Sequence, residues 1–198
     1  MIDLRFDVKD LKRVLGPLSG MPKLVDDGLR SAIRRTAATM RTDVNRQIRL
    51  HSFLKAGDIS PAISKPLFAS SAGSFEGVVR ISGKPLAMDK FRLVPRRVTA
   101  RKRMRSSRWG LAGYQIGPGE PVRQATERGG RSKGFVVRLG GKLYLMRRSG
   151  KKMQRMYGYS AQYFAVFDAV RRAVENNARQ NFEKRMAHEL SYRLGKLR

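Results

Sequence analysis

Two long runs of apolar residues at helical spacing frame this chain and limit what it can fold into. The first run recurs every three or four residues between Val25 and Ile48, and the second recurs between Tyr163 and Leu194. Such stripes are typical of helices that bury one face. We therefore predict one helix that begins near Pro22, and another that runs from an N-cap at Ser160 to a stop at Gly195.

The second predicted helix is long for a chain of this size. At 1.5 Å per residue it would reach roughly 50 Å, which exceeds the core of a small domain. We therefore expect its distal part to pack on another subunit or protein.

The segments outside these helices are rich in β-strand signals. Residues 2–8 alternate apolar and charged side chains, and residues 77–82 and 91–98 are β-prone, with Pro95 placing the latter at an edge. Two apolar runs, 135–139 and 142–147, are separated by Gly140-Gly141, which predicts a tight hairpin.

Two further segments are predicted as loops. Residues 110–121 are rich in Gly and Pro and should form an extended loop, and residues 147–155 should form a basic loop around Ser149-Gly150.

Together these elements predict one α+β domain over residues 1–198. A small, mostly antiparallel sheet is packed by the two long helices, and extended basic loops project from it. We divide this domain into an N-terminal strand and helix (1–66), a basic β region (77–155) with an extended loop (96–121), and the C-terminal helix (160–195).

Positive charge is concentrated in the middle of the chain. Residues 80–155 hold 22 Lys or Arg against three acids, and the formal net charge of all 198 residues is +28. Such a surface repels itself and favours anionic neighbours, either nucleic acid or acidic protein. The candidate contact residues are Arg96, Arg97, Arg101, Lys102, Arg103, Arg105, Arg108, Trp109, Arg147, Arg148, Lys151, Lys152 and Arg155.

Three interpretations of these cations remain open. They dock on acidic neighbours in an assembly, they bind nucleic acid with Trp109, Tyr114 or Tyr144 available for stacking, or they are an inert solvated surface. Seven cations without an acid in residues 96–108 argue against the inert surface, because the repulsion among them would be unrelieved.

The sequence offers little reaction machinery. Cysteine is absent, the two histidines His51 and His188 lie far apart, and no P-loop, nucleophile elbow or zinc-protease motif occurs. We therefore expect no catalytic residue, no cofactor and no metal. No apolar run approaches the roughly 20 residues of a membrane span, and the first residues lack the apolar core of a signal peptide. We expect a protein kept in the cytoplasm or packaged into a particle built there.

Three sequence pieces carry a resemblance to a known family. They are residues 77–86 followed by Phe91, residues 134–137, and residues 145–155 leading into the last helix. With the order of predicted elements, they make most of the chain similar to the minor tail protein Z family of long-tailed bacteriophages. The chain departs from that pattern in a longer loop over 109–121 and a last helix that begins without a proline pair.

The resemblance implies a structural protein without enzymatic activity. Such proteins form a homo-oligomeric ring, commonly sixfold, at the junction of phage head and tail, and they complete the tail so that it joins the head. The implied partners are the adjacent connector or stopper and the tail terminator or tail tube, with genomic DNA in the lumen. The implied location is the neck or tail of the virion, assembled in the host cytoplasm. The alternative is a basic nucleic-acid-binding protein of ribosomal type.

Overall fold

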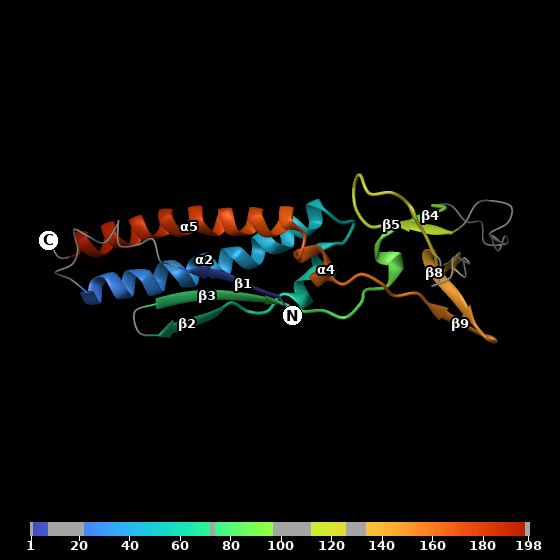
Figure 1. The fold of residues 1–198 in the computed structure, drawn as a ribbon, viewed down its shortest axis with the longest axis horizontal. Coiled ribbons are helices and arrows are strands. Elements are labelled where there is room, and N and C mark those ends of the chain that lie inside the picture. The colour runs from blue at the N-terminus through green and yellow to red at the C-terminus, as the bar shows by residue number, and fades with distance from the viewer. Residues whose placement is uncertain (1, 8–21, 72–73, 97–111, 126–133, 197–198) are drawn as a thin grey trace.

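The computed structural model describes residues 2–7, 22–71, 74–96, 112–125 and 134–196. The molecule is elongated, with two long helices lying side by side over one end and short strands forming the other (Figure 1). The candidate contacts from Arg97 to Trp109 lie outside the described residues.

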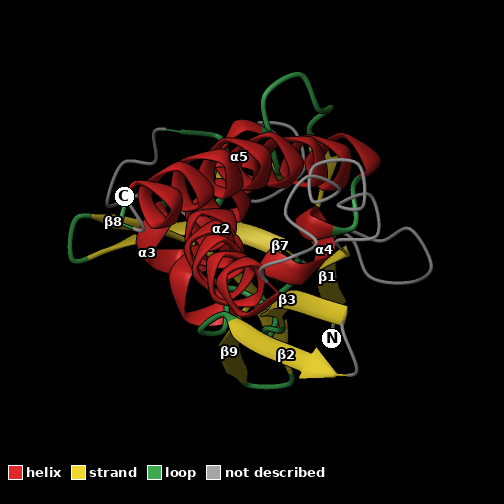
Figure 2. Ribbon diagram, turned by 90° about the vertical axis from the view of Figure 1, so that its left-hand side faces the viewer, coloured by secondary structure: helices red, strands yellow, loops and turns green. Residues whose placement is uncertain are grey.

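The helical end has three layers. Helix α5 (Asp168–Gly195) packs on α2 (Pro22–Leu50), and α2 covers a sheet of β1 (Ile2–Asp7), β3 (Ser74–Ile81) and β2 (Leu67–Ser71), in the order β1-β3-β2 (Figure 2). All neighbouring strands are antiparallel. Helix α2 approaches β3 closely at Gly77, where an added Cβ would lie 3.2 Å from Ile33 and 3.3 Å from Ala37.

Short elements connect this end to the strands beyond it. They are α3 (Ala56–Ile59), the 3-10 turns η3 (Ser60–Ala62) and η4 (Met88–Lys90), and α4 (Ala161–Ala165). Beyond them lie two more antiparallel sheets: β4 (Arg92–Val94), β5 (Gly113–Gln115) and β6 (Arg123–Gln124), then β7 (Gly134–Leu139), β8 (Lys142–Ser149) and β9 (Lys152–Arg155). The fold class is α+β as predicted, with the β structure divided among three small sheets.

The last predicted helix is interrupted. Ser160 caps it as expected, accepting a hydrogen bond from the backbone N–H of Tyr163 at 3.3 Å. The helix then breaks, because Phe167 has an extended backbone with φ −61° and ψ 128°. Phe167 packs against the Tyr163 and Phe164 rings at centroid distances of 5.3 and 5.6 Å, so aromatic packing accompanies the break.

The distal part of α5 is covered within the chain. Phe182, Met186 and Leu190 pack with Leu29 and Ile33 of α2 in one buried cluster. The reason for expecting another subunit there, an apolar stripe too long to be covered within the chain, therefore does not hold for Phe182 to Leu190. The prediction treated the two amphipathic stripes separately, whereas they pack against each other.

Candidate interface at the basic end

The sheet at the end farthest from the helices is built from two consecutive hairpins. Gly140 and Gly141 form the predicted turn between β7 and β8, with φ of +53° and +79°. The segment predicted as a basic loop, 147–155, instead continues β8 and returns as β9 through a turn at Gly150. Its residues pair in register, Arg147 with Gln154 and Arg148 with Met153, so the loop prediction was wrong.

The register divides this sheet into two faces. Val136 pairs with Leu145, and both are buried against the core. Side chains alternate along a strand, so the opposite face carries Leu139, Tyr144 and Met153. We call this opposite side the outer face: Phe135, Val137, Leu139, Lys142, Tyr144, Met146, Arg148, Met153 and Arg155.

Large apolar side chains are exposed at both ends of the outer face. Leu139 is 49% exposed and Met153 is 53% exposed, while Tyr157, just beyond β9, is 60% exposed. Leu139 pairs with Lys142, and Met153 pairs with Arg148, six residues further along β8. At about 3.3 Å per residue, the two exposed ends are roughly 20 Å apart.

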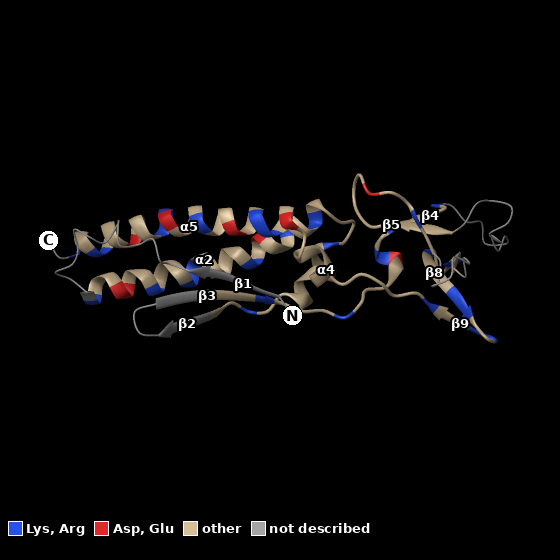
Figure 3. Cartoon of the chain, viewed as in Figure 1, with Lys and Arg blue, Asp and Glu red and all other residues tan. Residues whose placement is uncertain are grey.

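Cations gather around the tip of the β8–β9 hairpin (Figure 3). Arg148, Lys151 and Lys152 are exposed, and none of them forms an ion pair with an Asp or Glu of the described residues. Arg147 is partly buried and donates a long hydrogen bond of 3.5 Å to Gln154. Of the contacts predicted in residues 147–155, Arg148, Lys151 and Lys152 therefore lie on an exposed surface, and Arg147 does so only in part.

Arg155 has a different environment from the other predicted contacts. Its guanidinium donates two hydrogen bonds to the Asp89 carboxylate, at 2.7 and 2.5 Å, and lies 5.2 Å from the Tyr144 ring centroid. The hydrogen bonds to Asp89 raise the pKa of Arg155 above its usual range. Arg155 therefore ties β9 to η4, and we assign it a structural role within the chain.

The predicted stacking residue Tyr114 is also engaged inside the molecule. It lies 6.2 Å from Tyr159 between ring centroids, within a cluster that includes Tyr163 and Phe164. Tyr159 in turn accepts a hydrogen bond of 2.6 Å from Arg123. Tyr144 is half-buried beneath Arg155, and Trp109 lies outside the described residues. These contacts make Tyr114 and Tyr144 poor candidates for base stacking.

The environment of Tyr114 predicts a loss of stability at alkaline pH. Burial, and next the hydrogen bond with Tyr159, raises the pKa of Tyr114 from 10.0 to about 12. Between these values the unfolded chain has lost a proton that the folded chain keeps, so the free energy of unfolding falls as pH rises. We expect the free energy of unfolding of the Tyr114→Phe variant to fall less steeply with pH than that of the unchanged chain. Urea unfolding at intervals from pH 9 to 12 measures both curves. Parallel curves for the two proteins would contradict the assignment.

The segment with seven cations, residues 96–108, which we call the cationic arm, lies within the described residues only at Arg96. Arg96 is exposed and lines a cavity between α3, η4, β4 and the start of β8. Lys55, Lys90, Arg92 and Lys142 line the same cavity, and sequence analysis did not single them out. They come from segments far apart in the chain. Lys90, Arg92 and Lys142 lie in the basic region 80–155, which was the signal for them, whereas Lys55 lies outside it and had none.

Comparison with known protein families, curated proteins and solved structures finds no match. The resemblance to the minor tail protein Z family therefore rests on the sequence pieces and on the order of elements. None of the helices in the described ranges combines the length and apolarity that a bilayer span requires.

Proposed function

We propose that this chain is a structural subunit of a homo-oligomeric ring at the head–tail junction of a long-tailed bacteriophage. The observation that carries the proposal is the outer face, which exposes Met153 near the cations of the hairpin tip and Leu139 at its other end, with the exposed Tyr157 just beyond β9. Exposed apolar side chains rimmed by charge are typical of protein contact surfaces. The proposed role is tail completion and head joining, with DNA passing through the lumen.

The arrangement of the outer face fits a contact between subunits better than a solvated surface. Among the described strands, β7 and β9 are the two edges of their sheet, so each presents backbone groups along one side, apart from the Gly134 N–H, which donates to the Ala125 carbonyl oxygen. The apolar ends of the face lie roughly 20 Å apart, which is wide enough to contact an extended neighbour. The net charge of +28 favours a neighbour of opposite charge elsewhere on the surface, and the phage connector, tail proteins or DNA would supply it.

The proposal is tested by the assembly state of the purified chain. We expect rings by negative-stain electron microscopy and a discrete oligomer by light scattering. The variant Leu139→Lys with Met153→Lys is expected to be monomeric, because two cations would enter the contact. The control Leu50→Lys with Tyr192→Lys, which alters exposed side chains on the long helices, should still form rings.

A monomer at every concentration would contradict the ring. Equal loss of assembly in the control would contradict the assignment of the contact to the outer face. A monomer whose affinity for mixed-sequence DNA falls steeply with salt would support the alternative of a ribosomal-type nucleic-acid-binding protein.

A further inference from the structure

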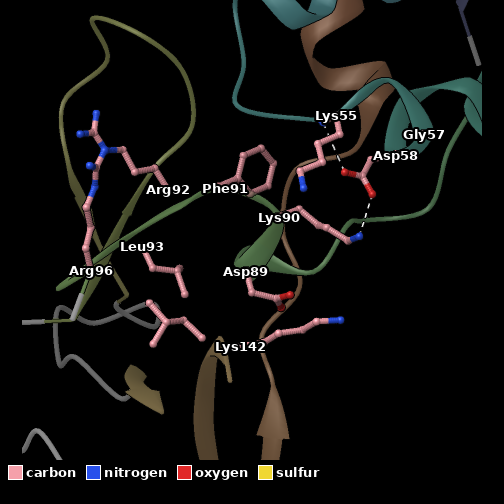
Figure 4. Close-up of a pocket in the computed structure, with 11 residues that line it drawn as sticks. Lys55, Gly57, Asp58, Asp89, Lys90, Phe91, Arg92, Leu93, Arg96 and Lys142 are labelled. Atoms are coloured by element: carbon pink, nitrogen blue, oxygen red, sulfur yellow. Dashed lines mark hydrogen bonds and ion pairs between the residues drawn. The ribbon is translucent and has the colours of Figure 1, made fainter. Parts of the chain in front are cut away.

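A cavity of about 680 Å³ lies between the helical body and the basic sheets. Three separate segments line it: residues 55–58 at the start of α3, residues 89–96 through η4 and β4, and residues 142–143 at the start of β8. This volume is within the range of pockets that hold ligands or anchoring side chains. Figure 4 shows the side chains that these segments direct around it.

Five cations line this cavity: Lys55, Lys90, Arg92, Arg96 and Lys142. Two carboxylates accompany them, and both are engaged. Asp58 pairs with Lys90 at 2.7 Å, and Asp89 pairs with Arg155, which does not line the cavity.

Four of the five cations are therefore not offset by a carboxylate in the described part of the chain. Lys55, Arg96 and Lys142 have no recorded ion pair there, and all three are exposed. Arg92 contacts only neutral groups in that part, the Gln115 side-chain oxygen at 3.4 Å and the Phe53 ring at 5.7 Å. Like charges gathered from three segments repel one another, and an anionic ligand would relieve that repulsion.

The wall of the cavity is not only cationic. Phe91, Leu93 and Leu143 also line it, from the same segments as Lys90, Arg92 and Lys142. A nucleic-acid backbone needs cations and gains little from an apolar wall. A peptide with an apolar side chain flanked by carboxylates would match both the apolar and the cationic residues of the wall. The guanidinium group of Arg92 or Arg96 is suited to bind a carboxylate through two hydrogen bonds.

We propose that this cavity binds an acidic segment of a partner protein that carries an apolar anchor residue. The anchor packs against the partly exposed Leu143 and the edges of the buried Phe91 and Leu93. Its flanking carboxylates pair with the cations left unpaired within the described residues, Lys55, Arg92, Arg96 and Lys142. This inference names the chemistry of one neighbour in the assembly and rests on the proposed function. It places the neighbour next to the cationic arm that begins at Arg96.

The test uses the full chain and three fluorescent probes at fixed salt. They are a short peptide that alternates glutamate with leucine, a peptide of equal charge that alternates glutamate with serine, and a mixed-sequence single-stranded DNA. The site variant is Lys55→Gln, Arg92→Gln and Lys142→Gln. The matched control is Lys23→Gln, Arg41→Gln and Lys184→Gln, which removes three exposed cations that do not line the cavity.

We expect the leucine peptide to bind more tightly than the serine peptide. The site variant should weaken leucine-peptide binding by about ten-fold or more, which corresponds to the loss of a few charge-assisted contacts. The control should change it less than about two-fold, because only long-range charge is lost. Unchanged far-ultraviolet circular dichroism would show that both variants are folded.

Three results would overturn the inference. They are equal binding of the two peptides, equal weakening by the site and control variants, and DNA binding that depends on the site residues while peptide binding does not. Ring formation is scored separately by microscopy. A failed peptide experiment with intact rings would thus reject this site alone, and bound peptide without rings would reject the assembly alone.

Discussion

Replacing Phe164 by alanine is expected to lower the free energy of unfolding by about 3–5 kcal/mol. Phe164 is fully buried at the junction of the two ends of the molecule. Its ring lies 6.0 Å from Phe91 beside β4, 5.3 Å from Tyr163 and 5.6 Å from Phe167. Truncation removes these contacts and leaves a cavity whose walls come from several elements. We expect these elements to move little into the cavity, so most of the lost packing energy is not recovered. Urea unfolding followed by circular dichroism measures the change.

The neighbouring Val166 provides a control for this substitution. It lies in the same turn but is 55% exposed, so Val166→Ala should cost less than about 0.5 kcal/mol. A loss below about 1 kcal/mol for Phe164→Ala would show that the aromatic cluster does not join the two ends of the molecule. Phe164→Leu should fall between the two variants, because it keeps most of the buried apolar volume.

The parts of this fold that the sequence predicted correctly depend on local signals. The stripe from Val25 to Ile48 lies within α2, and the Gly140-Gly141 turn joins β7 to β8 as expected. An apolar stripe at helical spacing predicts an amphipathic helix in most folds. Two adjacent glycines between apolar runs likewise predict a tight hairpin turn. The α+β class followed from these signals without knowledge of any long-range contact.

The wrong predictions concern segments whose structure depends on distant partners. Gly113–Gln115 was assigned to a loop because of its glycines, yet it is the central strand between β4 and β6. Gly113 is required there by close packing, since an added Cβ would lie 2.7 Å from the Arg123 carbonyl oxygen. Local composition could not reveal that approach, because Gly113 and Arg123 meet only when the sheet forms.

The candidate interface was predictable in charge but not in pairing. The cations of residues 147–152 were identified from the sequence, and they lie on an exposed hairpin. The partner of Arg155 is Asp89, 66 residues earlier, and the sequence gives no sign of this contact. The same limit applies to the cavity, whose cations come from three segments. The density of Lys and Arg in the sequence locates a basic region. The fold then determines which of these cations pair with a carboxylate of the same chain and which can bind a partner.

Replacing Asp89 by asparagine is expected to lower the free energy of unfolding by about 2–3 kcal/mol. Asp89 accepts two hydrogen bonds from Arg155, and its side chain is only 11% exposed. The substitution removes the negative charge and leaves the guanidinium among other cations, including Lys90 and Lys142 around the adjoining cavity. The 35% exposure of the Arg155 side chain allows water to offset part of this loss, which keeps the expected effect below that of a fully buried pair.

The reciprocal substitution separates the ion pair from its surroundings. Arg155→Gln should cost less than Asp89→Asn. The carboxylate left by Arg155→Gln still has cations nearby, whereas the guanidinium left by Asp89→Asn has no second carboxylate paired with it among the described residues. The exposed pair of Asp168 with Arg171 is the control, and Asp168→Asn should cost under about 0.5 kcal/mol.

A double-mutant cycle of Asp89→Asn with Arg155→Gln, measured by urea unfolding, gives the coupling of the two side chains. Additive single losses would mean that the pair does not tie β9 to η4. A larger loss for Arg155→Gln would mean that packing on Tyr144, rather than the excess of positive charge, sets the stability of this end.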